Sequence, residues 1–148
     1  MSNDLYESDE YLWKQEIAKK YQEAEPNLFE YLMEMARNEE REIKSKCRVL
    51  FLHLLKYQYQ SEKQSISWVL SIRSAYRDLT VIFNDSKSLY NRYIDETYFI
   101  SAYKNAVLDA STEIFLSKSM FPKVFPWDPK TVWTEEFVET FLMEYIDS

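Results

Sequence analysis

The fold is decided by residues 28–59, LFEYLMEMARNEEREIKSKCRVLFLHLLKYQY, a long stretch without glycine or proline. Apolar side chains recur there at spacings of three, four or seven residues, at Phe29, Leu32, Ala36, Ile43, Cys47, Leu50, Leu54 and Tyr57. This period is that of an α-helix with one buried face. We therefore predict one helix from about Leu28 to Tyr59, separated from the preceding segment by Pro26 and capped by Asn27.

The two halves of this predicted helix differ in polarity. The acidic run from Glu34 to Glu42 in the first half is interpreted as a solvated face. From Val49 to Leu55 the helix is apolar nearly all round, because Phe51 and Leu52 lie off the main stripe. A helix of that kind is covered on several sides. Either the C-terminal tail or another protein chain is expected to cover it.

Three further helices are predicted around the long one. The first runs from about Ser8 to Ala24 with Ser8 as its N-cap, and the next from about Ser67 to Phe83. Residues 84–86, Asn-Asp-Ser, are expected to form a turn in which Asn or Asp replaces a C-cap glycine. The last long helix runs from about Leu89 to Lys118. It carries a seam of small side chains at Ala102, Ala106 and Ala110, which permits close helix packing.

The C-terminal part is irregular. Three prolines between residues 121 and 129 exclude a helix there. The aromatic side chains of this tail, Phe121, Phe125 and Trp127, are expected to bury themselves across the bundle. A short last helix is predicted to begin at Thr134. The sequence thus predicts an all-α, single-domain, four-helix-type bundle spanning 1–148, with an irregular tail rich in proline and aromatic residues.

Composition excludes several classes of enzyme. The chain has no glycine, and average usage is about 7%. P-loop NTPases, Rossmann dehydrogenases and α/β-hydrolases need glycine for close backbone approach, so these are poor interpretations. The single cysteine, Cys47, excludes an intramolecular disulfide and a cysteine-rich zinc site. It fits a reducing compartment, where we expect it to be a small buried apolar side chain.

Charge is distributed unevenly along the chain. Residues 1–46 carry a net charge of −5, residues 47–94 of +4 and residues 95–148 of −6. Basic helices lying beside acidic ones explain this most simply. The first residues lack a signal pattern, and no apolar run approaches the ~20 residues that span a bilayer. We expect a cytoplasmic protein with no membrane contact.

One group of polar and aromatic side chains is the candidate site. His53, Lys56, Tyr57 and Gln60 share one helical face, with Trp68 and Arg73 on the next helix. Antiparallel packing would bring Asp9, Arg73 and Glu113 to this face. The candidate binding residues are therefore Asp9, Trp13, His53, Lys56, Gln60, Trp68, Arg73 and Glu113. They form either a binding pocket or a polar network that fixes helix register.

Two other chemistries were weighed on the residues. A di-iron carboxylate site needs paired Glu-x-x-His motifs, but Leu50 stands three residues before the only histidine, so no metal or cofactor is predicted. Arg48 and His53 have the Arg-x4-His spacing that resembles the motif of HEPN-type ribonucleases. Arginine would stabilise phosphate charge there while histidine acts as acid or base. Val49 stands where those enzymes usually have a polar residue.

Several motifs resemble one bacterial family. They are Leu5-Tyr6 with Asp9 and Trp13, the block from His53 to Arg73, the serine-rich segment 85–89, the alanine seam ending at Glu113, and Phe121-Pro122 with Pro126-Trp127. Over about residues 5–133 the chain is similar to the family labelled domain of unknown function 29, from cyanobacteria and proteobacteria. Departures are Tyr57 in place of tryptophan, Phe125 in place of cysteine, and missing glycines near Asn38 and Phe115. The resemblance implies a helical bundle and assigns no catalytic residue.

These observations lead to two functional expectations. The first is a non-enzymatic module that binds another protein or a second copy of itself, based on the apolar surface at Val49–Leu55. The alternative is a ribonuclease or RNA-binding protein that uses Arg48, His53 and the basic central segment. An overall charge of −7 makes contact with nucleic acid the less favoured expectation.

Overall fold

The computed structural model describes residues 9–21 and 26–145 of the chain. Its helices are α2 (Glu10–Tyr21), α3 (Pro26–Tyr59), η1 (Ser61–Lys63), α4 (Ile66–Asp85), α5 (Lys87–Asp95), α6 (Tyr98–Ile114), η2 (Lys118–Met120) and α7 (Glu135–Tyr145), where η marks a short 3-10 helix. The described residues contain no sheet, only an isolated bridge between Asp9 and Ser86. The all-α prediction is confirmed, but the six α-helices of these described residues are not a strict four-helix bundle.

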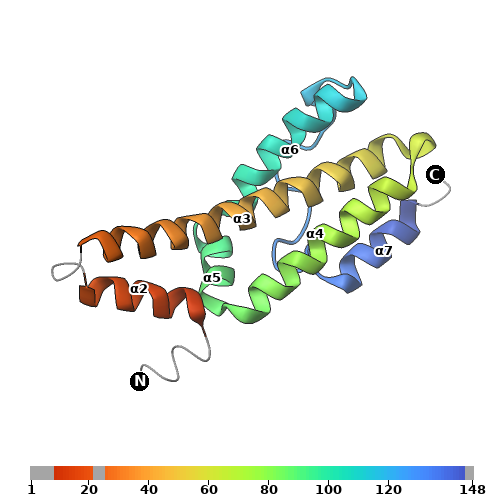
Figure 1. The fold of residues 1–148 in the computed structure, drawn as a ribbon. Helices are drawn as coiled ribbons and strands as arrows, with labels where there is room; N and C mark the ends of the chain where they lie inside the picture. The colour runs from red at the N-terminus through yellow and green to blue at the C-terminus, as the bar shows by residue number, and fades with distance from the viewer. Residues whose placement is uncertain (1–8, 22–25, 146–148) are drawn as a thin grey trace.

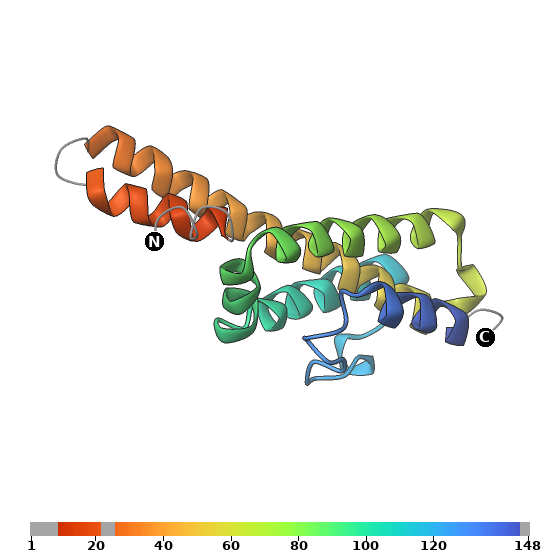
Figure 2. The same ribbon diagram turned by 90° about the horizontal axis from the view of Figure 1, so that it is seen from below.

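Helix α3 is the spine of the molecule, and its 34 residues correspond to about 51 Å. Helix α2 packs along its first half, and the two helices project together as an arm (Figures 1 and 2). Helices α4 and α6 pack against α3, while α7 lies along α4. The short helix α5 contacts α2, α4 and α6, so it ties the base of the arm to the rest of the fold.

The start of α3 differs from the prediction. Pro26 is the first helical residue, and Asn27 lies inside the helix rather than at its cap. Proline is favoured at this position because the first N–H of a helix has no intrahelical partner. At the start of α2, the predicted cap Ser8 lies outside the described residues. Asp9 caps the helix instead, since its Oδ1 accepts a hydrogen bond from the Leu12 N–H at 3.1 Å.

The turn after α4 also differs from the prediction. Ser86 follows the helix in an extended conformation, with φ −139° and ψ 102°, and no left-handed residue stands in for a C-cap glycine here. The Ser86 hydroxyl accepts the Leu89 N–H at 3.2 Å and so caps α5. One serine thus ends α4 and starts α5, which turns the chain without glycine.

The predicted helix from Leu89 to Lys118 is wrong, because the chain turns between α5 and α6. Thr97 has φ 54°, in the left-handed region, and separates the two helices. Tyr93 and Tyr98 explain the turn. Five residues apart on one straight helix, they would point about 140° apart, yet both are buried. The turn allows both rings to enter the core.

Helix α6 ends at a second left-handed residue, Phe115, with φ 57°. This is the place where the family resemblance leads one to expect a glycine, and the left-handed backbone explains that expectation. A bulky side chain in this conformation costs roughly 1–2 kcal/mol. Thr97 and Phe115 are the only residues of the described chain with positive φ.

The tail covers the apolar half of α3, as one of the two alternatives predicted. The Phe51 ring centroid lies 5.1 Å from that of Phe125 and 5.7 Å from that of Trp127. Figure 2 shows this irregular segment crossing the molecule between α6 and α7. Of the predicted apolar surface, Val49 remains 37% exposed. The chain's own tail therefore covers most of the apolar surface that had suggested a partner protein.

Two other predicted features are confirmed. The seam residues Ala102, Ala106 and Ala110 are buried where α6 packs on α3. Helix α7 begins at Glu135, and Thr134 precedes it as predicted. The Thr134 hydroxyl accepts the Phe137 N–H at 3.3 Å, which caps the helix.

Candidate functional site

Half of the predicted site does come together on α3, α4 and α6. The Lys56 ammonium lies 3.1 Å from the Glu113 carboxylate and 4.8 Å from the centroid of the Trp68 ring. Lys56 is buried, with 8% exposure, and His53 lies one helical turn before it. A buried lysine between a carboxylate and an aromatic face has its charge satisfied on both sides.

His53 has an environment that keeps it neutral. Burial lowers the pKa of His53, and the Lys56 charge lowers it further against the opposing effects of the Val49 carbonyl and Glu113. The ring Nδ1 lies 2.9 Å from the Val49 carbonyl oxygen. This places the proton on Nδ1, because a carbonyl only accepts. The arrangement is that of a locally satisfied histidine.

The remaining central residues do not join this cluster. The Arg73 guanidinium forms a two-pronged ion pair with the Glu139 carboxylate on α7, with its closest contact at 2.7 Å. Gln60 donates its backbone N–H to the Lys56 carbonyl at 2.9 Å, and no side-chain bond links it to the cluster. His53, Lys56 and Gln60 line neither of the two surface cavities described below, at the end of α6 and between α3 and α4. The cluster resembles a packed network more than a pocket.

Asp9 lies at the other end of the molecule, contrary to the predicted convergence on the His53 face, and the candidate residue Trp13 lies there with it on α2. Helix α2 contacts α3 near Glu40, through the Tyr11 hydroxyl. From Glu40 to His53 the helix rises about 20 Å, so α2 cannot reach the His53 face. Trp13 is half-buried on α2. The predicted set therefore divides into two groups that belong to different regions.

Asp9 is the centre of the first region. Its Oδ1 accepts the Ser86 hydroxyl at 2.6 Å, and its Oδ2 accepts the Ser88 N–H at 2.5 Å. Burial would raise the pKa of Asp9, but the hydrogen bonds from Ser86, Ser88 and Leu12 together lower it below its usual range. The carboxylate thus joins the first turn of α2 to the first turn of α5.

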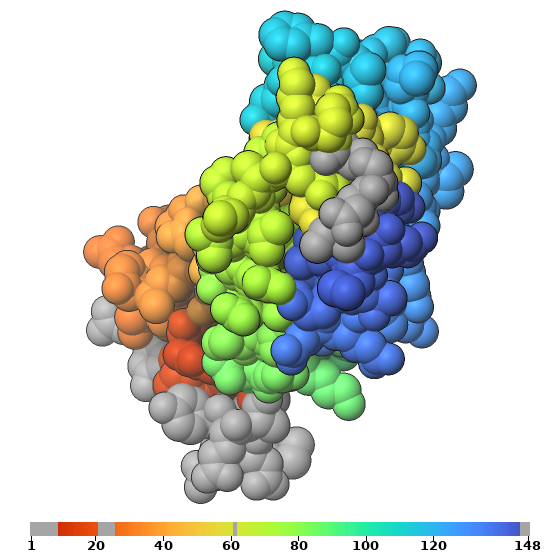
Figure 3. All heavy atoms as spheres, turned by 90° about the vertical axis from the view of Figure 1, so that its right-hand side faces the viewer, coloured from red at the N-terminus to blue at the C-terminus, as the bar shows by residue number. Residues whose placement is uncertain are grey.

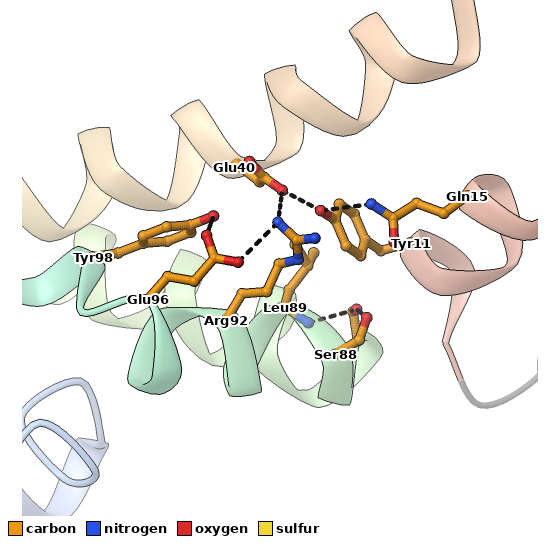
Figure 4. A network of polar contacts seen from close by, with 9 residues as sticks. Tyr11, Gln15, Glu40, Ser88, Leu89, Arg92, Glu96 and Tyr98 are labelled. Atoms are coloured by element: carbon orange, nitrogen blue, oxygen red, sulfur yellow. Dashed lines mark hydrogen bonds and ion pairs between the residues drawn. The ribbon is translucent and has the colours of Figure 1, made fainter. Parts of the chain in front are cut away.

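A second polar group continues this contact toward α3. Glu40 accepts hydrogen bonds from the Tyr11 hydroxyl and from the Arg92 guanidinium, the latter at 2.7 Å (Figure 4). Arg92 also pairs with Glu96 at 3.2 Å, and the Tyr98 hydroxyl donates to Glu96 at 3.0 Å. We call this group of side chains the arm junction. Its members are Asp9, Tyr11, Glu40, Ser86, Ser88, Arg92, Glu96 and Tyr98.

The arm junction corrects one interpretation of the sequence. Glu39 and Glu40 were assigned to a solvated face, yet both are partly buried against α2. Glu39 accepts the Lys14 ammonium at 2.6 Å, and Glu40 binds Tyr11 and Arg92. Burial and the Glu40 carboxylate raise the pKa of the Tyr11 hydroxyl, so it remains a donor. The carboxylates of Glu39 and Glu40 therefore hold α2 and α5 against α3.

Arg48 and His53 do not form an assembled pair in this chain. The Arg48 guanidinium binds the Asp109 carboxylate on α6 through two bonds of 2.6 and 2.7 Å. The Arg48 charge that would hold a phosphate is therefore paired with Asp109.

Cys47 is a buried residue of α3. Burial raises the pKa of its thiol, which agrees with its predicted role as a small apolar side chain.

A different surface has the properties that a binding site needs. We name it the α6–η2 edge, residues 103–124, which comprise α6 from Tyr103 onward and the segment that follows. It holds a cavity of about 310 Å³, lined by Tyr103, Lys104, Val107, Leu108, Lys118, Phe121, Pro122 and Lys123. Figure 3 shows the end of α6 and the following residues at the upper margin of the molecule.

The same edge carries exposed apolar side chains outside the lining of the cavity. Phe115 is 93% exposed, Val124 80% and Met120 58%. The backbone between them is well fixed. The Tyr103 hydroxyl donates to the Pro122 carbonyl at 2.7 Å, and the buried Phe121 ring packs on Tyr59. The edge is thus a preformed surface with uncovered apolar groups.

Sequence reasoning missed this surface. Phe115 was noted only as a place where glycine is expected, and the lysines of the edge stand in a segment of net negative charge. The available signal was that missing glycine. A large aromatic residue where the backbone favours glycine indicates a side chain retained for a reason other than folding.

The structure gives two further observations on the described part of the chain. No three His, Cys, Asp or Glu side chains there are grouped so that they could hold a metal ion. No described helix combines the length and the apolar character needed to cross a bilayer.

The chain belongs to the family described as Domain of unknown function DUF29, whose model matches residues 5–138. The expected range of about 5–133 is therefore confirmed and slightly extended. Neither the curated proteins nor the solved structures contain a match to this chain. The family match establishes relationship and carries no activity.

Proposed function

We propose that this member of the DUF29 family is a non-enzymatic protein-binding module, and that the α6–η2 edge is its docking surface. The observation that carries the proposal is Phe115. Its side chain is almost fully exposed, so it contributes little packing, and its left-handed backbone has a cost in stability. A residue whose backbone costs stability and whose side chain gives little packing in return is best explained by a use outside the fold.

The α6–η2 edge is favoured over the other apolar surface near α3. A cavity between α3 and α4 is lined by Val49 and Leu70, which are 37% and 59% exposed. Its lysine, Lys46, is already paired with Asp78 at 2.9 Å. Neither apolar residue has a strained backbone. This surface has exposed side chains but no feature that folding alone fails to explain.

The ribonuclease alternative receives less support from the geometry. Arg48 is paired with Asp109, and the His53 Nδ1 is bonded to the Val49 carbonyl of its own helix, so the two side chains are not arranged as a pair around one phosphate. The apolar half of α3, which first suggested a partner, is covered by the tail. The support for a binding function therefore comes from the α6–η2 edge.

The test is capture of partners by the tagged full-length chain from its own host, followed by native mass spectrometry. Three forms are compared: wild type, Phe115→Gly and the control Thr97→Gly. The control places glycine at the other left-handed residue, away from the α6–η2 edge. We expect a stoichiometric partner, or a second copy, with wild type and Thr97→Gly, and its loss with Phe115→Gly. Equal capture by all three forms would contradict the proposed surface.

A further inference from the structure

We infer that the α6–η2 edge binds an acidic amphipathic helix of a partner protein. This inference rests on the proposed function and names the chemistry of its partner. Apolar side chains of the partner helix would enter the cavity beside Leu108 and Phe121. Carboxylates on its flanks would meet Lys104, Lys118 and Lys123.

Charge is the first argument. Residues 98–124 contain three lysines, Lys104, Lys118 and Lys123, and two acidic residues, Asp109 and Glu113. The two carboxylates are bound from α3, by Arg48 and Lys56.

The three lysines are exposed, and none is paired with a carboxylate of the described chain. Lys14, Lys46 and Lys56 each have an acidic partner, whereas Lys63, Lys87 and Lys130 are exposed and have no ion pair within the described chain. What distinguishes Lys104, Lys118 and Lys123 is that all three line one cavity. An otherwise acidic protein thus presents a local cationic surface around an apolar cavity.

Shape is the second argument. A volume of about 310 Å³ lies at the small end of ligand pockets, which run from about 300 to 1,000 Å³. It suits a few side chains of a larger partner better than a whole cofactor. An amphipathic helix that lays its apolar face into a groove makes this kind of contact. Phe115, an exposed aromatic ring at the end of α6 on the same edge, has the character of an interface anchor.

An anionic lipid surface shares the charge requirement but fits less well. A net charge of −7 opposes approach of the whole molecule to an anionic membrane. The lysines border a hollow rather than a flat apolar face, and lipid binding does not need a hollow. We therefore favour a protein partner and include vesicles in the test.

The test uses fluorescein-labelled helical peptides of about 16 residues, near the length at which isolated helices become stable. Each has leucine or phenylalanine at i, i+3, i+4 and i+7, with glutamate, glutamine or lysine at the other positions. Fluorescence anisotropy measures their binding to the full-length chain. The protein forms are wild type, Phe115→Gly, Thr97→Gly and the triple variant Lys104→Glu/Lys118→Glu/Lys123→Glu.

We expect the glutamate peptide to bind wild type and Thr97→Gly equally. The glutamine and lysine peptides should bind wild type at least about tenfold more weakly. Phe115→Gly should weaken binding of the glutamate peptide by about thirtyfold. The triple variant should lose the glutamate peptide and bind the lysine peptide instead, a charge exchange that a merely damaged fold cannot produce.

Three results would overturn the inference. If the glutamine peptide binds wild type as well as the glutamate peptide, the charge argument fails, while a retained effect of Phe115→Gly leaves the proposed function intact. If no peptide binds, the helical partner is excluded, and host capture separately decides the proposed function. If phosphatidylglycerol vesicles bind wild type but not the triple variant, and the glutamate peptide does not bind, the partner is a lipid surface.

Discussion

The two left-handed residues of the described chain, Thr97 and Phe115, lie in regions that differ in the pairing of their charged side chains. Thr97 belongs to the turn at the arm junction, where Asp9, Glu40 and Arg92 each have several partners. Phe115 lies at the α6–η2 edge, where the lysines have none in the described chain. The difference separates charges that hold the fold from charges that remain available to a partner.

The comparison has a thermodynamic consequence. Removing a polar group that is paired and buried leaves its hydrogen-bond partner unsatisfied, and this lowers the stability of the fold. Groups that are exposed and unpaired contribute little, so changing them alters binding alone. Mutations at the arm junction should therefore change the free energy of unfolding, whereas mutations at the edge should leave it unchanged or raise it.

The largest effect is expected for Asp9→Ala. The change removes the cap of α2 and leaves the Ser86 hydroxyl and the Ser88 N–H without their acceptor. We expect a loss of about 3 kcal/mol in the free energy of unfolding, measured by urea denaturation. Asp9→Asn keeps an acceptor and should lose less. Equal stability of all three proteins would show that the carboxylate does not join the arm to α5.

The same carboxylate gives a dependence on pH. The pKa of Asp9 is lowered in the folded state, so its contribution is present above the unfolded pKa of about 3.9. It is lost as the pH falls through the lower folded value. In urea titrations between about pH 6 and pH 3, wild type should lose more stability than Asp9→Asn. Parallel curves would contradict this.

A smaller loss is expected for Glu40→Leu. It removes the acceptor of the Tyr11 hydroxyl and one carboxylate of Arg92, which keeps Glu96. Hydrogen bonds to charged groups suggest a loss of about 2 kcal/mol by urea denaturation. The matched control is Glu42→Leu, an exposed residue two positions further on α3, which should change stability little. Similar losses for both would mean that the Tyr11–Glu40–Arg92 contact is not specific.

Phe115→Gly is expected to act in the opposite direction. Glycine adopts the left-handed conformation freely, and no packing is lost because the ring is exposed. The free energy of unfolding should rise by about 1 kcal/mol, measured by thermal or urea denaturation. Thr97→Gly should give a similar gain. A clear loss of stability in Phe115→Gly would show that the ring supports the fold after all.

The smallest effect on stability is expected for the triple replacement of Lys104, Lys118 and Lys123 by glutamate. Exposed, unpaired charges usually change stability by no more than about 0.5 kcal/mol. Circular dichroism and urea denaturation should therefore be close to those of wild type. A loss comparable to that of Glu40→Leu would remove the distinction between the two regions.

Much of the fold was predictable because long periodic segments report their buried face directly. The period in α3 and the prolines of the tail predicted their elements correctly, and the alanine seam predicted the buried face of α6, though not where that helix begins. The break at Thr97 was not predictable, since the apolar pattern continues through it without glycine or proline. It arises because Tyr93 and Tyr98 both enter the core, which is a property of tertiary packing.

The candidate site was predicted only in part. Helical periodicity placed His53 and Lys56 on one face, and Glu113 and Trp68, also named from the sequence, contact Lys56 there. The position of Asp9 was predicted wrongly, although only four residues separate α2 from α3, which makes α2 pack back along the first half of α3.

The α6–η2 edge was missed for a different reason. The spacing of residues along the sequence does not show that the apolar side chains of this edge are exposed or that its lysines lack ion pairs.

The most direct test of the account is an NMR titration of the isotope-labelled protein with the glutamate peptide, which reports binding residue by residue. The account predicts that amide shifts concentrate in residues 103–124 and leave the arm junction unchanged. Shifts centred on Asp9 and Glu40, or on His53 and Lys56, would contradict the claim that the unpaired α6–η2 edge is the surface this protein uses.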